Sequence, residues 1–193
     1  MNQLIIFIKN PQLGKVKTRL AASIGADAAL AVYHKLCQHT RQTVLGVEVD
    51  RQLYYSDFID RHDAWKEEQF VKHQQVGSDL GARMNQAFQD SLKQGNRAVI
   101  IGSDCPQLTA DLLRDAFQAL VEHPFVLGPA QDGGYYLLGM REPCPGLFHK
   151  MEWSTDKVTE MTLQRIHEQK KSCFLLPILS DIDTIEDWEK WGW

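Results

Sequence analysis

Long hydrophobic runs are missing from this chain of 193 residues. The first apolar run covers only residues 4–8, whereas a membrane-spanning helix needs about 20 apolar residues and a signal peptide a core of about 7–15. Cysteines are few and far apart (Cys37, Cys105, Cys144 and Cys173), without the paired spacing of a zinc site or a disulfide framework. We therefore expect a reduced, cytoplasmic protein without a membrane span.

Acidic residues are absent from the first 26 positions, although the whole chain has a net charge of −4. The same segment carries four cations, namely Lys9, Lys15, Lys17 and Arg19. The overall charge gives no reason to expect a nucleic acid or an anionic membrane as partner. A local cationic segment in an acidic protein indicates instead a small anionic ligand.

The common nucleotide-binding motifs are also missing. A Walker A loop ending at Lys17 and Thr18 would need glycine where this chain has Pro11 and Val16, and the dinucleotide fingerprint is absent. Residues 9–20 nevertheless combine glycine and cations directly after a predicted strand. This pattern predicts a phosphate-binding loop of backbone N–H groups and cationic side chains, with a solvated basic turn as the alternative.

Strands and helices alternate along the chain. Apolar runs predict strands over residues 4–8, 52–56, 70–74, 98–101, 125–128, 135–139 and 173–176. Helical spacing and capping residues predict helices over residues 27–44, 80–92, 109–121 and 156–169, and a terminal helix from Thr184. This alternation predicts an α/β sandwich, and without repeats or linkers we expect a single domain over residues 1–193.

A carboxylate, Asp104, stands just after the strand predicted over residues 98–101. Ligands of open α/β sheets bind beyond the carboxyl ends of the strands. One or two carboxylates together with substrate phosphates are a typical Mg²⁺ site. Asp104 is therefore a candidate metal ligand, and the capping of an ordinary strand-to-helix turn is the alternative.

Three further aspartates, Asp132, Asp181 and Asp183, follow or lie between predicted strands. If these strands are parallel neighbours, their ends bring two or three of the carboxylates near one cation. Asp183 has a simpler alternative, the capping of the helix that starts at the next residue. Gly133 and Gly134 permit close backbone approach, which a hairpin turn would use equally.

Two other segments have a functional and a purely structural interpretation. Asp79 opens the helix predicted over residues 80–92, whose free N–H groups would meet a ribose or base while Arg83 reaches a phosphate. An ordinary capped helix uses the same residues. Trp153 offers a stacking face to an acceptor, or serves as a buried anchor.

Together, these motifs resemble a bacterial family of GT-A-type proteins, formerly a domain of unknown function and now usually labelled a glycosyltransferase. Its wider relatives include guanylyltransferases of cofactor biosynthesis. The resemblance spans nearly the whole chain and rests on the order of these motifs: Phe7-x-Lys9-x-Pro11-x-x-Gly14-x-Val16-Lys17-Thr18-Arg19-Leu20, Asp79-Leu80-Gly81-x-Arg83-Met84, Gly102-Ser103-Asp104-Cys105-Pro106, Gly128-Pro129-x-x-Asp132-Gly133-Gly134-Tyr135-Tyr136, Trp153-Ser154-Thr155 and Asp181-Ile182-Asp183-Thr184.

The resemblance implies a Rossmann-like nucleotide-diphospho-sugar transferase fold of GT-A type, a three-layer α/β/α sandwich with a mostly parallel, mixed sheet. It implies nucleotide contacts from Lys9, Gly14, Lys17, Arg19, Asp79, Arg83 and Ser103. It places Mg²⁺ or Mn²⁺ on Asp104 and Asp183, with Gly102 in place of the first aspartate of the usual Asp-x-Asp element. The acceptor would contact Gly133, Gly134, Tyr135 and Trp153.

Three functions remain open on this basis. The first is a glycosyltransferase, in which Lys17 stabilises developing charge and Asp132 is the general base for the acceptor hydroxyl. The second is a guanylyltransferase-like nucleotidyltransferase, which joins an NTP to a phosphorylated acceptor and releases pyrophosphate. The third is a nucleotide-binding module without turnover. All three take a nucleotide-sugar or an NTP, and the first two also a small-molecule acceptor.

Overall fold

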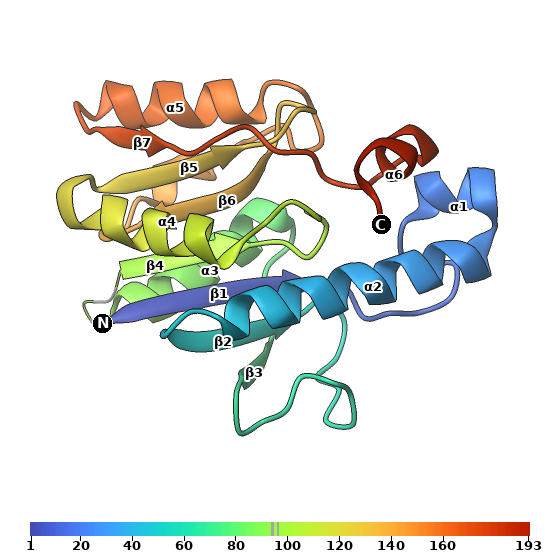
Figure 1. The fold of residues 1–193 in the computed structure, drawn as a ribbon. Helices are drawn as coiled ribbons and strands as arrows, with labels where there is room; N and C mark the ends of the chain where they lie inside the picture. The colour runs from blue at the N-terminus through green and yellow to red at the C-terminus, as the bar shows by residue number, and fades with distance from the viewer. Residues whose placement is uncertain (94, 96) are drawn as a thin grey trace.

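A seven-stranded sheet forms the centre of the computed structural model, which describes residues 1–93, 95 and 97–193 (Figure 1). The strands follow the order β3-β2-β1-β4-β6-β5-β7. Their bounds are β1 (Asn2–Ile8), β2 (Asp50–Tyr55), β3 (Val71–Gln74), β4 (Arg97–Ile101), β5 (Phe125–Pro129), β6 (Tyr135–Met140) and β7 (Cys173–Leu175). Strand β6 runs antiparallel to β4 and β5, and the other neighbouring pairs are parallel. The sheet is therefore mixed and mostly parallel, as predicted.

Helices cover both faces of the sheet. They are α1 (Thr18–Ile24), α2 (Ala26–Leu45), α3 (Leu80–Leu92), α4 (Ala110–Glu122), α5 (Val158–Glu168) and α6 (Ile185–Trp191), with a short 3₁₀ helix at Pro145–Leu147. Helices α2 and α4 pack on one face, and α3 and α5 on the other (Figure 1). The predicted three-layer α/β/α sandwich is confirmed.

Strand β4 shows why the sheet is buried on both sides. Val99 and Ile101 point into the core under α2 and α4, while Ala98 and Ile100 point into the core under α3 and α5. All four side chains are at most 4% exposed. A continuous apolar run, rather than an alternating one, is what a strand with helices on both faces requires.

A short helix, α1, lies where the sequence predicts only a loop. It packs with α2 and α6 in a small core of its own, formed around Leu20, Leu36 and Ile182. Seven residues are too few for a stable isolated helix, so tertiary packing rather than local sequence stabilises α1. Gly25, at a φ of 87°, separates α1 from α2, and α2 therefore starts at Ala26 rather than after a cap at Asp27.

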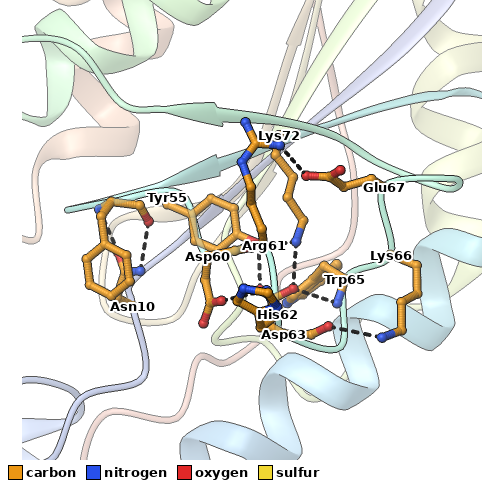
Figure 2. A network of polar contacts seen from close by, with 11 residues as sticks. Asn10, Tyr55, Asp60, Arg61, His62, Asp63, Trp65, Lys66, Glu67 and Lys72 are labelled. Carbon is orange, nitrogen blue, oxygen red and sulfur yellow. Dashed lines mark hydrogen bonds and ion pairs between the residues drawn. The ribbon is translucent and has the colours of Figure 1, made fainter.

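The polar segment between β2 and β3 is anchored by Trp65. Trp65 is 4% exposed, and its ring meets Phe70 edge-on at 5.0 Å. Asp63 accepts hydrogen bonds from the Tyr55 hydroxyl at 2.5 Å and from Lys72 Nζ at 2.8 Å (Figure 2). These contacts give the segment a defined structure despite its polar sequence.

Asn10 joins this segment to the loop after β1 (Figure 2). Its Nδ2 donates to the Phe58 carbonyl at 2.9 Å, and its Oδ1 accepts from the Asp57 N–H at 3.0 Å. The side chain is 2% exposed, so both hydrogen bonds are shielded from water. The loop after β1 is therefore fixed at its start.

Within the described residues, no helix combines the length and the apolar character needed to cross a membrane.

Candidate functional site

The loops that follow β1, β4 and β5 meet at one edge of the sheet, where β6 begins (Figure 1). The segment after β7 is bound into the same edge. The Ile182 N–H donates to the Asp104 carbonyl, and the Gln131 N–H to the Leu179 carbonyl, both at 2.9 Å. The topology thus brings together the segments that carry Asp104, Asp132 and Asp183, which lie far apart in the sequence.

Lys17 is the counter-ion of Asp104. Its Nζ donates to Asp104 Oδ2 at 2.8 Å and to the Ile182 carbonyl at 2.5 Å. The Lys17 side chain is 4% exposed, whereas that of Asp104 is 42% exposed. The Lys17 backbone adopts the left-handed conformation, with a φ of 48°, as the N-cap of α1. The ammonium is thus buried beneath a carboxylate that is open to a ligand.

A second ion pair from the same loop lies nearer to solvent. Arg19 Nη1 contacts Asp183 Oδ2 at 2.7 Å, and the two side chains are 69% and 46% exposed. Exposed pairs of this kind contribute little to stability, because water and salt screen them. Arg19 can therefore exchange Asp183 for an anionic ligand at low cost.

Lys9 and Gly14, the other two residues predicted for the phosphate loop, differ in how firmly they are held. Lys9 is fixed through its backbone, because its N–H donates to the Tyr33 hydroxyl at 2.8 Å and its carbonyl accepts from that hydroxyl at 3.0 Å. Its side chain is exposed. Gly14 takes a φ of 72° in the exposed turn of the loop, which a residue with a side chain would adopt only under strain.

Tyr33, in α2, is a site residue that the sequence does not reveal. Its hydroxyl lies 3.2 Å from Ser103 Oγ, and Ser103 Oγ donates to Asp104 Oδ1 at 3.4 Å. Burial raises the pKa of Tyr33 well above its usual value, so the hydroxyl stays protonated. One buried side chain therefore fixes the loop after β1 against the loop after β4. In the sequence it is merely one apolar position of a helix.

A cleft of about 400 Å³ opens beside Asp104. Its polar lining comes from the strand ends and from α3: Lys9, Ser56, Gln75, Arg83, Ser103 and Asp104. Arg83 donates to Gln75 Oε1 at 3.3 Å and to the Gly77 carbonyl at 3.2 Å, so its guanidinium is held in the cleft wall. Asp79 takes the capping role, because its Oδ1 accepts from the Ala82 N–H at 2.8 Å.

The turn between β5 and β6 forms the other side of this edge. Gly133 has a φ of 85°, and a Cβ there would lie 2.1 Å from the Asp156 carbonyl oxygen, so only glycine fits. The Gly134 N–H donates to Asp132 Oδ1 at 2.9 Å, and Asp132 itself is exposed. Its Oδ1 is therefore tied to the turn.

Tyr135 and Trp153 lie next to this turn, with ring centroids 6.5 Å apart in an edge-to-face arrangement. Trp153 also packs against the start of α3, where a Cβ on Gly81 would come within 2.8 Å of the indole. Trp153 is therefore packed in place as an anchor and at the same time borders the edge where the acceptor is predicted.

Asp181 lies among these charges, and the sequence placed it with the other aspartates at the strand ends without giving it a role of its own. Burial, together with the charges of Asp104, Asp132 and Asp183, raises the pKa of its carboxyl to about 7, against the opposing effect of Lys17. Four carboxylates therefore influence one another at this edge of the sheet. Such crowding of negative charge favours a bound cation.

The donor set at this edge is of the hard-oxygen type. Within the described ranges, no group of three or more His, Cys, Asp or Glu side chains forms a metal site on its own. Asp104 and Asp183 are partly open, and Mg²⁺ commonly binds one or two carboxylates plus substrate phosphates. The residues therefore fit Mg²⁺ or Mn²⁺ as a site that a phosphorylated ligand completes.

The sequence profile of a bacterial family described as "Uncharacterized protein conserved in bacteria (DUF2064)" matches residues 38–155. The chain belongs to the DUF2064 family. No curated protein matches its sequence. A crystal structure from Desulfovibrio desulfuricans G20, provisionally named a nucleotide-diphospho-sugar transferase, is 33% identical and has a TM-score of 0.88; the match covers 96% of this chain and 84% of that one.

More distant structures share the fold of this DUF2064 protein. The 4-diphosphocytidyl-2C-methyl-D-erythritol synthase of Anaerococcus prevotii DSM 20548 is 10% identical, with a TM-score of 0.62 and coverage of 99% of this chain and 95% of that one. Rv0371c of Mycobacterium tuberculosis H37Rv, solved with manganese, is 14% identical, with a TM-score of 0.58 and coverage of 98% and 97%. The chain therefore has the nucleotide-diphospho-sugar transferase fold that its motifs imply.

The stability of this DUF2064 protein should fall with rising pH because of Asp181. Its pKa is about 7 in the folded chain and about 3.9 in an unfolded one. Between these values only the folded state holds the proton, so stability is lost as pH rises from about 4 to about 7 and then levels off. In chelator-treated protein, Asp181→Asn should therefore raise Tm relative to wild type more at pH 8 than at pH 5. An equal difference at both pH values would contradict this.

Proposed function

We propose that this chain is a divalent-metal-assisted transferase that acts on a nucleotide-activated donor, and that the donor is a nucleotide-sugar. The observation that carries the proposal is the cleft of about 400 Å³ that opens beside Asp104 and its counter-ion Lys17. The name of the 33% identical relative supports the same class of reaction.

The strand order indicates how a nucleotide would lie along the cleft. Gln75, Ser56, Lys9 and Asp104 follow β3, β2, β1 and β4, which are neighbours in that order. Strands lie about 4.8 Å apart, so these residues span roughly 14 Å, enough for a nucleoside with its diphosphate. The phosphates would lie at the Asp104 end, where Lys17 and the candidate metal ligands are. The nucleoside would then lie toward Gln75 and Arg83.

Asp104 and Asp183 would hold the metal ion, which neutralises the charge of a departing diphosphate. Arg19 is exposed beside Asp183 and would add positive charge where the leaving group develops its own. Lys17 acts through Asp104 as a positioning residue, because its ammonium is buried against that carboxylate. Asp132 would accept the proton of the acceptor hydroxyl through the oxygen that does not bind Gly134.

A second reaction, nucleotidyl transfer, is favoured by one observation. Asp183 provides a second carboxylate at the edge where Asp104 lies, and the exposed guanidinium of Arg19 is paired with it. This arrangement suits an NTP, whose pyrophosphate leaves with more charge than a nucleoside diphosphate carries. A phosphorylated acceptor also brings its own nucleophilic oxygen, so this reaction needs no general base.

The products separate these reactions. The protein is incubated with a panel of NTPs and nucleotide-sugars, with Mg²⁺, with Mn²⁺ or with EDTA, and pyrophosphate and nucleoside diphosphate are assayed separately. We expect metal-dependent release of nucleoside diphosphate from a nucleotide-sugar. Pyrophosphate release from an NTP would instead identify the second reaction. Thermal stabilisation by a nucleotide without either product would identify a binding module.

A further inference from the structure

An apolar cavity of about 140 Å³ opens beside the nucleotide cleft. Leu80 and Met84 of α3, Phe7 near the end of β1 and Tyr135 at the start of β6 contribute to its walls, and Gly102 lies at its edge after β4. None of the residues predicted to contact the nucleotide lines this space, and Tyr135 is the one lining residue predicted to contact the acceptor.

The cavity is continuous with the cleft. Phe7, Leu80 and Gly102 line both of them. A Cβ on Gly102 would meet no atom within 4 Å, so the space above this residue is open. The backbone of Gly102 does not take the positive φ that favours glycine. What the glycine contributes here is therefore the opening itself.

The lining of the cavity is mostly apolar. The Tyr135 hydroxyl is directed at Met84 Sδ at 3.8 Å, and burial raises the pKa of Tyr135, so this group stays neutral. Phe7 packs against Tyr54, with ring centroids 5.5 Å apart, and presents only carbon. A sugar would leave its hydroxyl groups without partners in such a cavity, at a cost of a few kcal/mol for each. The sugar of the donor therefore does not fit here.

The position of the cavity indicates what occupies it. Tyr135 directly follows the Asp132–Gly134 turn, so the cavity lies between the nucleotide cleft and the predicted acceptor side. A cavity of about 150 Å³ lined by Leu, Ile and Phe is known to hold benzene. We propose that this cavity binds a compact apolar group of the acceptor, of the size of one six-membered carbon ring. That this group belongs to an acceptor rests on the function proposed above, whereas the apolar subsite itself does not.

Benzyl alcohol is a suitable probe, because it combines such a ring with one hydroxyl group. In protein with ¹³C-labelled methionine and leucine methyl groups, without nucleotide or metal, it should shift the Met84 and Leu80 signals saturably. Glycerol, which has no apolar group, should not. A wild-type protein without a saturable shift at Met84 would overturn the proposal.

Two substitutions test the opening at Gly102. Gly102→Leu fills it and should weaken binding of benzyl alcohol at least about tenfold, because a pocket discriminates by a factor of 10 or more against one misplaced methylene. Gly102→Ala adds only one methyl group and should weaken binding by a smaller factor. The matched control is Gly146→Leu, since a Cβ on Gly146 also meets no atom within 4 Å but lies outside the cavity. Equal affinities in Gly102→Leu and wild type would show that the probe binds elsewhere.

The product assay keeps the two proposals separate. If benzyl alcohol binds at Met84 but no nucleotide is bound or turned over, the apolar subsite stands and the proposed function fails. If nucleoside diphosphate is released but the probe does not bind, only the apolar subsite fails.

Discussion

Asp104→Asn is expected to lower nucleotide-dependent turnover by about 100-fold or more while the fold stays intact. The amide lacks the charge that holds a divalent cation, and metal assistance contributes several kcal/mol, at about 1.4 kcal/mol for each tenfold change in rate. The amide oxygen still accepts a hydrogen bond from Lys17 Nζ, which lies 2.8 Å from the native carboxylate oxygen. Turnover is measured as kcat/KM for release of nucleoside diphosphate, and Mn²⁺ binding by electron paramagnetic resonance.

The matched control for this experiment is Asp111→Asn. Asp111 also pairs with a cation, Arg114, but it lies on the surface of α4 and is 83% exposed. Turnover and Mn²⁺ binding should be unchanged in this variant. If Asp104→Asn keeps wild-type turnover and Mn²⁺ binding, Asp104 is not the metal ligand and the metal binds elsewhere.

Much of the fold could be predicted from the sequence, because buried parallel strands leave a strong local signal. The run that forms β4 is apolar at every position from 98 to 101, since helices pack on both faces of the sheet. Helix α1 could not be predicted in this way. Its stability comes from contacts with α2 and α6, and α6 lies at the other end of the chain.

In the candidate site, too, some features could be predicted from the sequence and others could not. Its acidic positions stand out because each follows or lies between strands, and strand ends meet at one edge. The pairing of Lys17 with Asp104 could not be predicted, because it depends on the left-handed backbone of Lys17 and on a carbonyl 165 residues away, that of Ile182. Tyr33 and Gln75 were missed because each is an isolated side chain in an otherwise ordinary helix or strand end.

The Lys17–Asp104 pair also predicts an asymmetric loss of stability. Asp104→Ala leaves the Lys17 ammonium, 4% exposed, with the Ile182 carbonyl as its one remaining partner among the described residues, and an unpaired buried charge costs about 3 kcal/mol or more. Lys17→Met leaves a carboxylate that is 42% exposed and therefore solvated, and removes the two hydrogen bonds that Nζ donates, to Asp104 and to the Ile182 carbonyl, at a cost of about 1 kcal/mol each.

The double variant Lys17→Met/Asp104→Ala should therefore be more stable than Asp104→Ala alone, because it buries no charge. The free energy of unfolding is measured by urea denaturation at pH 7, and the four proteins form a double-mutant cycle. The exposed Arg19–Asp183 pair is the control cycle, with an expected coupling of at most about 1 kcal/mol. A Lys17→Met variant as unstable as Asp104→Ala, or a double variant without recovery, would mean that burial of the ammonium does not determine the stability of this edge.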